Sequence, residues 1–170
     1  PTLDRARAGD RRAVADLVSR HGPALWALCR RMDRQPEDAY QEVWERILGR
    51  LDRFDPSGSA SLATWLRTVA TRLLIDRHRR RTVRGEVVPL PELPTAGDPL
   101  RHLEQARRVQ ALERALQTLP DAQRRVVVLH HVEGLDIQAI ADLEGVAPGT
   151  VKSRLHRGRA RLAAYLGGSP

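Results

Sequence analysis

The chain has 170 residues, 41% of them hydrophobic, which is enough for one domain or two small ones. Its formal net charge is +8 and all but one of its 29 basic residues are arginine, which indicates an acidic partner such as nucleic acid, although a codon bias would give the same excess. The single cysteine, Cys29, excludes an internal disulfide framework and is expected to be a buried thiol. Since the sequence has neither an apolar run of membrane-spanning length nor a signal peptide, we expect a cytoplasmic protein without membrane insertion.

The N-terminal part has helical periodicity and no alternating strand pattern. Asp10 fits the N-cap of a helix that the segment His21 to Pro23 is expected to interrupt or kink. Pro36 fits the first turn of the next helix. That helix carries an apolar stripe expected to be buried, formed by Tyr40, Trp44, Ile47 and Leu51. Residues 55–61, DPSGSAS, predict a loop, and a further helix is expected over residues 61–81.

Residues 82–100 contain four prolines and break the helical period, which predicts a linker. We therefore expect an all-α protein with two small helical domains, residues 1–81 and 101–168, joined by a proline-rich linker. The second domain is expected to open with a helix near residues 101–118. Its expected core-facing stripe is Leu103, Ala106, Val109, Leu112 and Leu116.

The C-terminal end has the layout of a helix-turn-helix, with an N-cap at Asp136, a turn at Gly145 and a second helix from Pro148. Residues 150–161 hold five basic residues and no acid. On a helical wheel a narrow ridge of mostly small residues faces outward between cations, which suits a helix that enters the major groove of DNA. The ridge is Ser153, His156 and Ala160, flanked by Lys152 and Arg157, with Arg154 nearer its edge.

Acidic residues concentrate in residues 33–55, which hold seven acids and four arginines within a chain of opposite net charge. Four polar residues lie on one face of the predicted helix, opposite the apolar stripe: Asp38, Gln41, Glu42 and Glu45. An acidic face repels DNA, so we expect it to meet a basic protein surface. A face that is merely solvated would give the same pattern.

Signatures of catalysis do not occur in the sequence, which lacks paired carboxylates beside a histidine and a phosphate-binding glycine loop. The neighbouring His130 and His131 have no cysteine or third ligand close by, so a metal site is not expected there. We therefore expect a binding protein without metal or cofactor, and not an enzyme.

Four segments carry a family resemblance. Residues 5–28, 36–48 and 54–81 (RARAGDRRAVADLVSRHGPALWAL, PEDAYQEVWERIL and FDPSGSASLATWLRTVATRLLIDRHRRR) resemble regions 2.1 to 2.4 of bacterial sigma-70-family factors. Residues 119–162, LPDAQRRVVVLHHVEGLDIQAIADLEGVAPGTVKSRLHRGRARL, resemble the domain of the same family that reads the −35 promoter element. A short linker replaces the large middle domain, as in the extracytoplasmic-function (ECF) subgroup.

The resemblance assigns a binding role to each half of the chain. In the family, the helix containing DAYQEVW binds core RNA polymerase, which implies polymerase contacts for Asp38, Gln41, Glu42 and Glu45. The second helix of the helix-turn-helix reads duplex DNA, which implies −35 contacts for Lys152, Ser153, Arg154, His156 and Arg157. Gln138 and His130 are weaker candidates for contacts to the same DNA.

The resemblance also implies that helix 61–81 and the loop before it hold the −10 element as a melted single strand. The loop would receive an unstacked base. The implied −10 contacts are Arg67, Thr68, Thr71, Arg72, Arg79, Ser57, Ser59 and Ser61, and Ile75 is also expected to face outward. Arg77, Arg80 and Arg81 would add cations along the DNA backbone. Arg72 and Leu62 stand where family members often have Asn and Phe, which affects the expected −10 preference.

The implied partners are core RNA polymerase, promoter DNA and an anti-sigma factor, which in this subgroup is often membrane-bound. The nineteen linker residues span at most about 65 Å, or about 19 base pairs, so the two domains can reach separate promoter elements. The C-terminal domain alone also resembles that of LuxR-type regulators. Under that alternative the chain would be a dimeric, operator-binding activator, but the N-terminal motifs favour a sigma factor.

Overall fold

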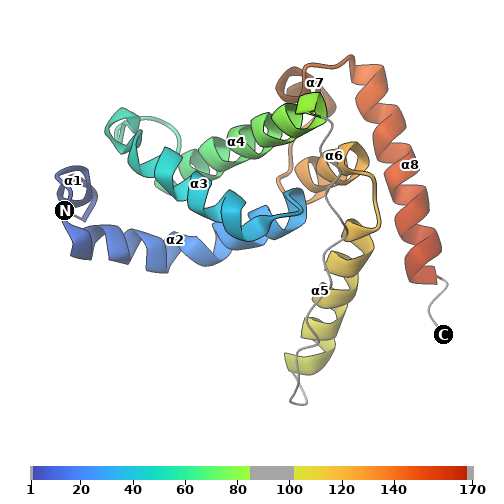
Figure 1. The fold of residues 1–170 in the computed structure, drawn as a ribbon, viewed down its shortest axis with the longest axis horizontal. Coiled ribbons are helices and arrows are strands. Elements are labelled where there is room, and N and C mark those ends of the chain that lie inside the picture. Colours follow the sequence, from blue (N-terminus) through green and yellow to red (C-terminus); the bar gives the residue numbers. More distant parts are fainter. Residues whose placement is uncertain (1, 85–101, 168–170) are drawn as a thin grey trace. The chain divides into compact units, whose positions relative to one another are not determined.

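The computed structural model describes residues 2–84 and 102–167, and all regular structure in these ranges is helical. The expected all-α fold is therefore confirmed. The chain divides into two compact units, Pro1–Val87 and Val88–Pro170, and each is described by itself (Figure 1). None of the helices in the described ranges is long and apolar enough to span a membrane.

Unit 1 is built around three helices that pack against one another in all three pairs. A short first helix packs against the second, and a 3-10 helix precedes the loop at residues 55–61. Its elements are α1 (Thr2–Arg7), α2 (Arg11–Met32), α3 (Pro36–Leu48), η1 (Leu51–Arg53) and α4 (Leu62–Arg84), shown in blue to green in Figure 1.

The long helix α2 starts at the predicted cap, because Asp10 Oδ1 accepts hydrogen bonds from the backbone N–H groups of Arg12 and Ala13, at 2.9 and 3.3 Å. The expected interruption at Pro23 is wrong, since α2 continues through it. Proline removes one backbone donor from the helix. Buried Leu25 and Leu28 follow it directly, and their packing holds the helix in place across this position.

The core of unit 1 follows the predicted stripe of α3. Trp44 and Ile47 are buried, whereas Tyr40 is half-buried and meets the ring of Trp26 edge-on at 5.4 Å between centroids. Cys29 of α2 is fully buried, and this burial raises the pKa of its thiol to about 12. The nearby carboxylate of Asp33 acts in the same direction.

Unit 2 packs its last helix against the three that precede it. Its elements are α5 (His102–Gln117), α6 (Asp121–His131), α7 (Ile137–Glu144) and α8 (Pro148–Gly167), shown in yellow to red in Figure 1. Asp136 caps α7 by accepting a hydrogen bond from the Ala139 N–H at 2.7 Å, and Gly145 ends it at a φ of 65°. These two predicted signals therefore set the two ends of α7.

A glycine allows α8 to approach α6 closely. A methyl group at Gly158 would lie 2.8 Å from Cγ2 of the buried Val127, well inside van der Waals contact. Only a residue without a side chain therefore fits at this crossing.

The end of one helix and the buried face of another differ from the sequence expectation. Helix α4 runs to Arg84, so the first three residues of the expected linker are helical, and the rest of that linker lies outside the described residues. Three residues of the expected core stripe of α5 have described side chains. Of these, Leu116 is buried, whereas Val109 and Leu112 are 44% and 42% exposed. The side chains of Leu103 and Ala106 lie outside the described residues.

Candidate nucleic-acid interface

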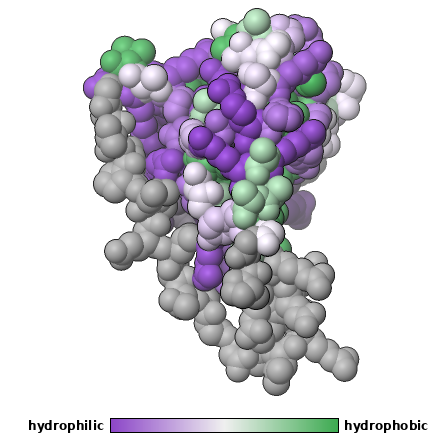
Figure 2. Space-filling model, turned by 90° about the vertical axis from the view of Figure 1, so that its right-hand side faces the viewer, coloured by the Kyte–Doolittle hydropathy of each residue, from purple (hydrophilic) through white to green (hydrophobic). Residues whose placement is uncertain are grey.

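The outward ridge predicted for α8 is present. Its inner face is formed by Val151, Leu155 and Gly158, all of which are buried. The exposed residues of the ridge and its shoulders are Lys152, Ser153, His156, Arg157 and Ala160. Hydrophilic residues predominate among the coloured residues of the face shown in Figure 2. Arg157 Nε donates to the Ser153 carbonyl at 3.3 Å, which lays the guanidinium along the ridge.

Arg154 lies apart from this ridge because it turns toward a buried carboxylate. Glu144 receives two parallel hydrogen bonds from Arg125, at 2.8 and 2.7 Å, and both side chains are nearly buried. Arg154 Nη1 lies 3.5 Å from the same carboxylate, with 24% of its side chain exposed. This cluster joins α6, α7 and α8. Arg125 and Glu144 were not predicted as functional residues from the sequence, although Glu144 is the last acid of the chain.

The two weaker candidates near α7 have different environments. His130 is half-buried, and its Nδ1 lies 2.9 Å from the Leu135 carbonyl, so the ring holds the turn before α7. Gln138 is exposed and donates to Asp142 Oδ1 at 2.9 Å. No group of three or more potential metal-ligating side chains occurs within the described part of the chain.

The loop at residues 55–61 is exposed and short, and small side chains shape it. Asp55 accepts hydrogen bonds from the Ser57 N–H and Oγ, at 2.9 and 2.7 Å, and these bonds lower the pKa of Asp55. Ser61 Oγ accepts from the Thr64 N–H at 3.2 Å and so caps α4. Ser57, Ser59 and Ser61 therefore lie on one exposed turn that leads directly into α4.

Four of the five −10 candidates on α4 are exposed, namely Arg67, Thr68, Arg72 and Arg79. The outward placement expected for Thr71 and Ile75 is wrong, since they are only 6% and 2% exposed. Because α4 packs against both α2 and α3, its buried face is wider than the single stripe of a helical wheel. Trp65 is partly buried against the core and packs against Phe54, with 5.7 Å between ring centroids.

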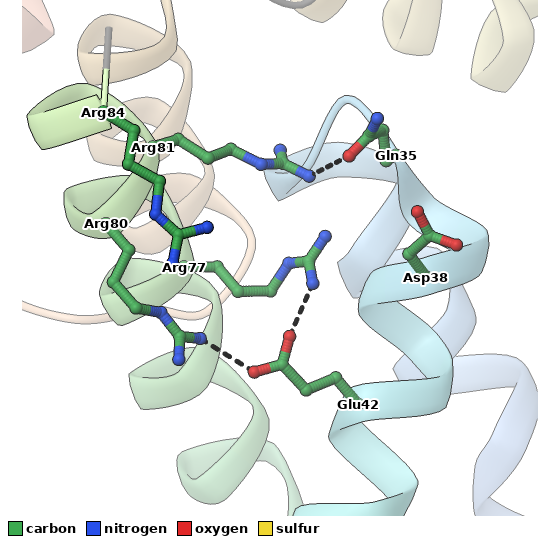
Figure 3. Close-up of a pocket in the computed structure, with 7 residues that line it drawn as sticks. All are labelled: Gln35, Asp38, Glu42, Arg77, Arg80, Arg81 and Arg84. Atoms are coloured by element: carbon green, nitrogen blue, oxygen red, sulfur yellow. Dashed lines mark hydrogen bonds and ion pairs between the residues drawn. The ribbon is translucent and has the colours of Figure 1, made fainter. Parts of the chain in front are cut away.

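The arginines near the end of α4 form an ion-pair network with α3 and the turn before it. Asp33 is almost completely buried and accepts from Arg77 Nε at 3.1 Å and from Arg81 Nη1 at 2.7 Å. Glu42 accepts from Arg77 at 2.5 Å and from Arg80 at 2.8 Å, as Figure 3 shows. The expectation that these three arginines add cations along DNA stays a prediction; in this structure, carboxylates of the same unit bind them.

This network surrounds a polar pocket of about 320 Å³ between α3 and α4. Gln35 also lines the pocket and accepts a hydrogen bond from Arg81 (Figure 3). Partial burial raises the pKa of Glu42, but the hydrogen bonds from Arg77 and Arg80 outweigh it, and its pKa lies below the usual value. Glu42 is therefore a firmly ionised link between the two helices.

The other three polar residues predicted on α3 are exposed, namely Asp38, Gln41 and Glu45. Gln41 Nε2 lies 3.5 Å from Glu45 Oε1, one helical turn away. The acidic face of α3 is thus largely open to a partner, while Glu42, at its edge, is bound to α4.

Comparisons with known proteins match both units. The family model for sigma-70 region 2 covers residues 17–84, and that for sigma-70 region 4 covers residues 109–162. The ECF RNA polymerase sigma factor SigW of Bacillus subtilis is 31% identical over 96% of this chain and 94% of its own length. SigM of Mycobacterium tuberculosis, also an ECF RNA polymerase sigma factor, is 37% identical over 94% of this chain and 80% of its own.

Two solved structures share the fold. One is the sigma factor RpoE in complex with the anti-sigma factor NepR from Bartonella quintana, with a TM-score of 0.61, 24% identity and coverage of 92% and 98% of the two chains. The other is CnrH in complex with the cytosolic domain of CnrY, with a TM-score of 0.52, 26% identity and coverage of 99% and 97%.

The two region matches occur in the order in which sigma factors carry them. They include most of α2 with α3 and α4, and the second half of α5 with α6, α7 and most of α8. A LuxR-type regulator would need a sensor domain where region 2 stands, so that alternative does not fit. The chain belongs to the sigma-70 family and is an ECF RNA polymerase sigma factor.

Proposed function

We propose that this sigma factor binds core RNA polymerase and directs promoter-specific initiation by reading two DNA elements in two different forms. Helix α8 reads the −35 element as duplex. Helix α4 and the loop at residues 55–61 hold the −10 element as a melted single strand. The observation that carries the proposal is the exposed ridge of α8, which lies on a helix segment, residues 150–161, with five basic residues and no acid.

For the −35 element, Arg157 and Lys152 supply donors to guanine edges or phosphates beside the ridge, while Ser153 and the neighbouring ridge residues let the helix backbone approach the bases. His156 is exposed on the same ridge. Arg154 contacts a phosphate only by leaving Glu144, so we place it at the edge of the interface. For Gln138 and His130 we propose weaker contacts to the DNA backbone.

For the −10 element, recognition must offset the few kcal/mol that unstacking a base costs, about the magnitude found for other extruded bases. The serines at 57, 59 and 61 offer hydroxyl groups to the edge of such a base. Arg67, Arg72 and Arg79 are exposed along α4 and attract the phosphates that follow, and Thr68 lies beside them. Thr71 is excluded from direct contact by its burial.

For polymerase binding, we propose that the exposed carboxylates Asp38 and Glu45, with Gln41 between them, meet a basic surface of the core enzyme. Glu42 contributes mainly by fixing α3 against α4, because Arg77 and Arg80 already hold its carboxylate. The chain thus acts as a transcription regulator that supplies binding surfaces and leaves the chemistry to the polymerase.

We further propose that an anti-sigma factor inhibits this protein by covering these same surfaces. The proposal is supported by the RpoE structure, which was solved with the anti-sigma factor NepR, and by CnrH, which was solved with the cytosolic domain of CnrY. A partner that covers the acidic face of α3 or the basic ridge of α8 would block polymerase or promoter binding respectively.

The test is transcription by reconstituted holoenzyme on a promoter library, followed by variants of α8. We expect Arg157→Ala to weaken promoter binding by about 1–3 kcal/mol if Arg157 reads a base, with the loss depending on the base at one −35 position. A phosphate contact would instead give a uniform loss and reduce the salt slope by about 1. Arg161→Ala, an exposed arginine further along α8, is the matched control. Failure of the wild-type protein to bind core enzyme would overturn the proposal.

A further inference from the structure

Helix α1 lies outside the residues that match sigma-70 region 2. It nevertheless contacts the backbone just before the loop at residues 55–61, which is called the −10 loop below. Arg7, its last residue, donates from Nε to the Leu51 carbonyl at 3.1 Å and from Nη2 to the Phe54 carbonyl. These carbonyls belong to the first residue of η1 and to the residue that ends it. One side chain therefore fixes the backbone immediately before the loop, 44 to 47 residues away in the sequence.

The same helix also packs beneath the other end of the loop. Ala6 and Leu3 of α1 belong to one apolar cluster with Leu51 on one side of the loop and Leu62 on the other. Phe54, whose carbonyl Arg7 binds, packs at a tilt against Trp65 in the first turn of α4. The two ends of the loop are thus held together, and α1 is part of that junction.

We infer that Arg7 is a positioning residue for −10 recognition, which holds the loop at residues 55–61 in the conformation that receives a melted base. The inference rests on the proposed function of that loop. A planar guanidinium donates to two carbonyls at once in a fixed geometry, which a lysine ammonium cannot reproduce. Anchoring the loop before DNA arrives lowers the ordering entropy that binding would otherwise cost.

The variants that test this are Arg7→Ala and Arg7→Lys, with Arg5→Ala as the control. Arg5 lies on the same helix, is 60% exposed and pairs with Asp10, away from the loop. Each variant is assembled into holoenzyme and mixed with promoter DNA that carries the fluorescent adenine analogue 2-aminopurine within the −10 element. Its fluorescence rises when the base unstacks. Binding of core enzyme and of a −35 duplex is measured in parallel.

We expect Arg7→Ala to weaken capture of the unstacked base about tenfold, since it removes two charge-assisted hydrogen bonds from a partly exposed site. Arg7→Lys should restore little of this loss, while Arg5→Ala behaves like the wild type. The defect should persist on a promoter with a pre-melted −10 bubble, because the receiving loop is itself displaced. Binding to core enzyme and to the −35 duplex should be unchanged for all three variants.

The outcomes separate the two levels of the proposal. If wild-type holoenzyme shows no rise in 2-aminopurine fluorescence, the proposed −10 function fails. If the wild type responds and both Arg7 variants respond equally well, the positioning role fails while the proposed function stands. The positioning role is also overturned if a pre-melted bubble restores base capture by Arg7→Ala, or if Arg7→Lys captures the base as well as the wild type does. If Arg7→Ala does not fold, judged by circular dichroism, Arg7→Lys decides by the same criteria.

Discussion

Helices α4 and α8 are both long and rich in arginine, but they use their arginines in opposite ways. Near the end of α4, Arg77, Arg80 and Arg81 bind carboxylates of the same unit. On α8, the ridge around Arg157 is exposed, and Arg154 is the residue that turns inward to a carboxylate. The positive charge of α4 is therefore partly neutralised within the fold, whereas that of α8 remains available.

The difference shows that an arginine-rich helix is not a DNA-binding surface by virtue of its charge alone. What matters is whether acids from other elements reach its guanidinium groups. Glu144, the acid that Arg154 of α8 approaches, already accepts two hydrogen bonds from Arg125. Little of its negative charge is therefore left to neutralise the ridge. In unit 1, Asp33 and Glu42 each bind two arginines of α4.

The largest effect is expected from Glu144→Ala, which leaves Arg125 buried without a counter-charge. We expect unit 2 to lose about 3–5 kcal/mol of stability toward urea, measured by far-ultraviolet circular dichroism. Because all three tryptophans lie in unit 1, the transition seen by tryptophan fluorescence should not move. Asp142→Ala, at an exposed site of the same helix, should change stability by less than about 0.5 kcal/mol. Equal effects of the two substitutions would contradict a buried pair.

A smaller loss is expected from Asp33→Ala in unit 1. It removes the shared partner of Arg77 and Arg81, but water still reaches both guanidinium groups, which are 13% and 15% exposed. We expect unit 1 to lose about 2–3 kcal/mol, seen by tryptophan fluorescence in urea. The exposed Asp38→Ala is the control. If Asp38→Ala were as harmful, the network would not be the cause.

The glycines at the helix contacts offer a matched pair of substitutions. We expect Gly158→Ala to destabilise unit 2 by about 1 kcal/mol, because overpacking against the branched, buried Val127 exceeds the gain in helix propensity. In Gly22→Ala the new methyl would meet the hydroxyl of Tyr40, the far end of a half-buried side chain that can move. The stability of the Gly22→Ala variant in urea should therefore stay close to that of the wild type. A larger loss for Gly22→Ala would reverse this ranking.

The smallest effect concerns pH. The pKa of Glu42 in the folded state lies below its usual value, so its contribution is present above the ordinary pKa of glutamate and is lost as pH falls below it. We expect the wild type to exceed Glu42→Gln in stability by about 1 kcal/mol at neutral pH and to lose this advantage as the pH falls through the lowered folded-state pKa of Glu42. Urea titrations across that range check it. An advantage that grew on acidification would contradict the sign.

Local signals allowed much of the fold to be predicted. The caps at Asp10 and Asp136 depend on residues two or three positions away, and the ridge of α8 depends on one helical period. Both are therefore visible in a short window of sequence. At Pro23 the local signal allowed either an interruption or a kink, and the interruption does not occur because α2 also packs against residues on other helices.

The parts that could not be predicted depend on distant partners. Asp33 and Arg77 are 44 residues apart, and no pattern in the sequence pairs them. Thr71 is buried because two helices, not one, pack against α4. Arg7 binds backbone carbonyls, which every residue has, so its partners leave no trace in the side-chain sequence.

The burial of Cys29 makes the protein ready for site-specific labelling. Because the thiolate is the reactive form and the pKa of this thiol is about 12, maleimide dyes would react with it very slowly in the folded chain. A second cysteine introduced at exposed Ser59 would therefore take up a fluorophore selectively, and Cys29 would not have to be removed first. Such a dye would sit on the −10 loop and follow the arrival of DNA in real time.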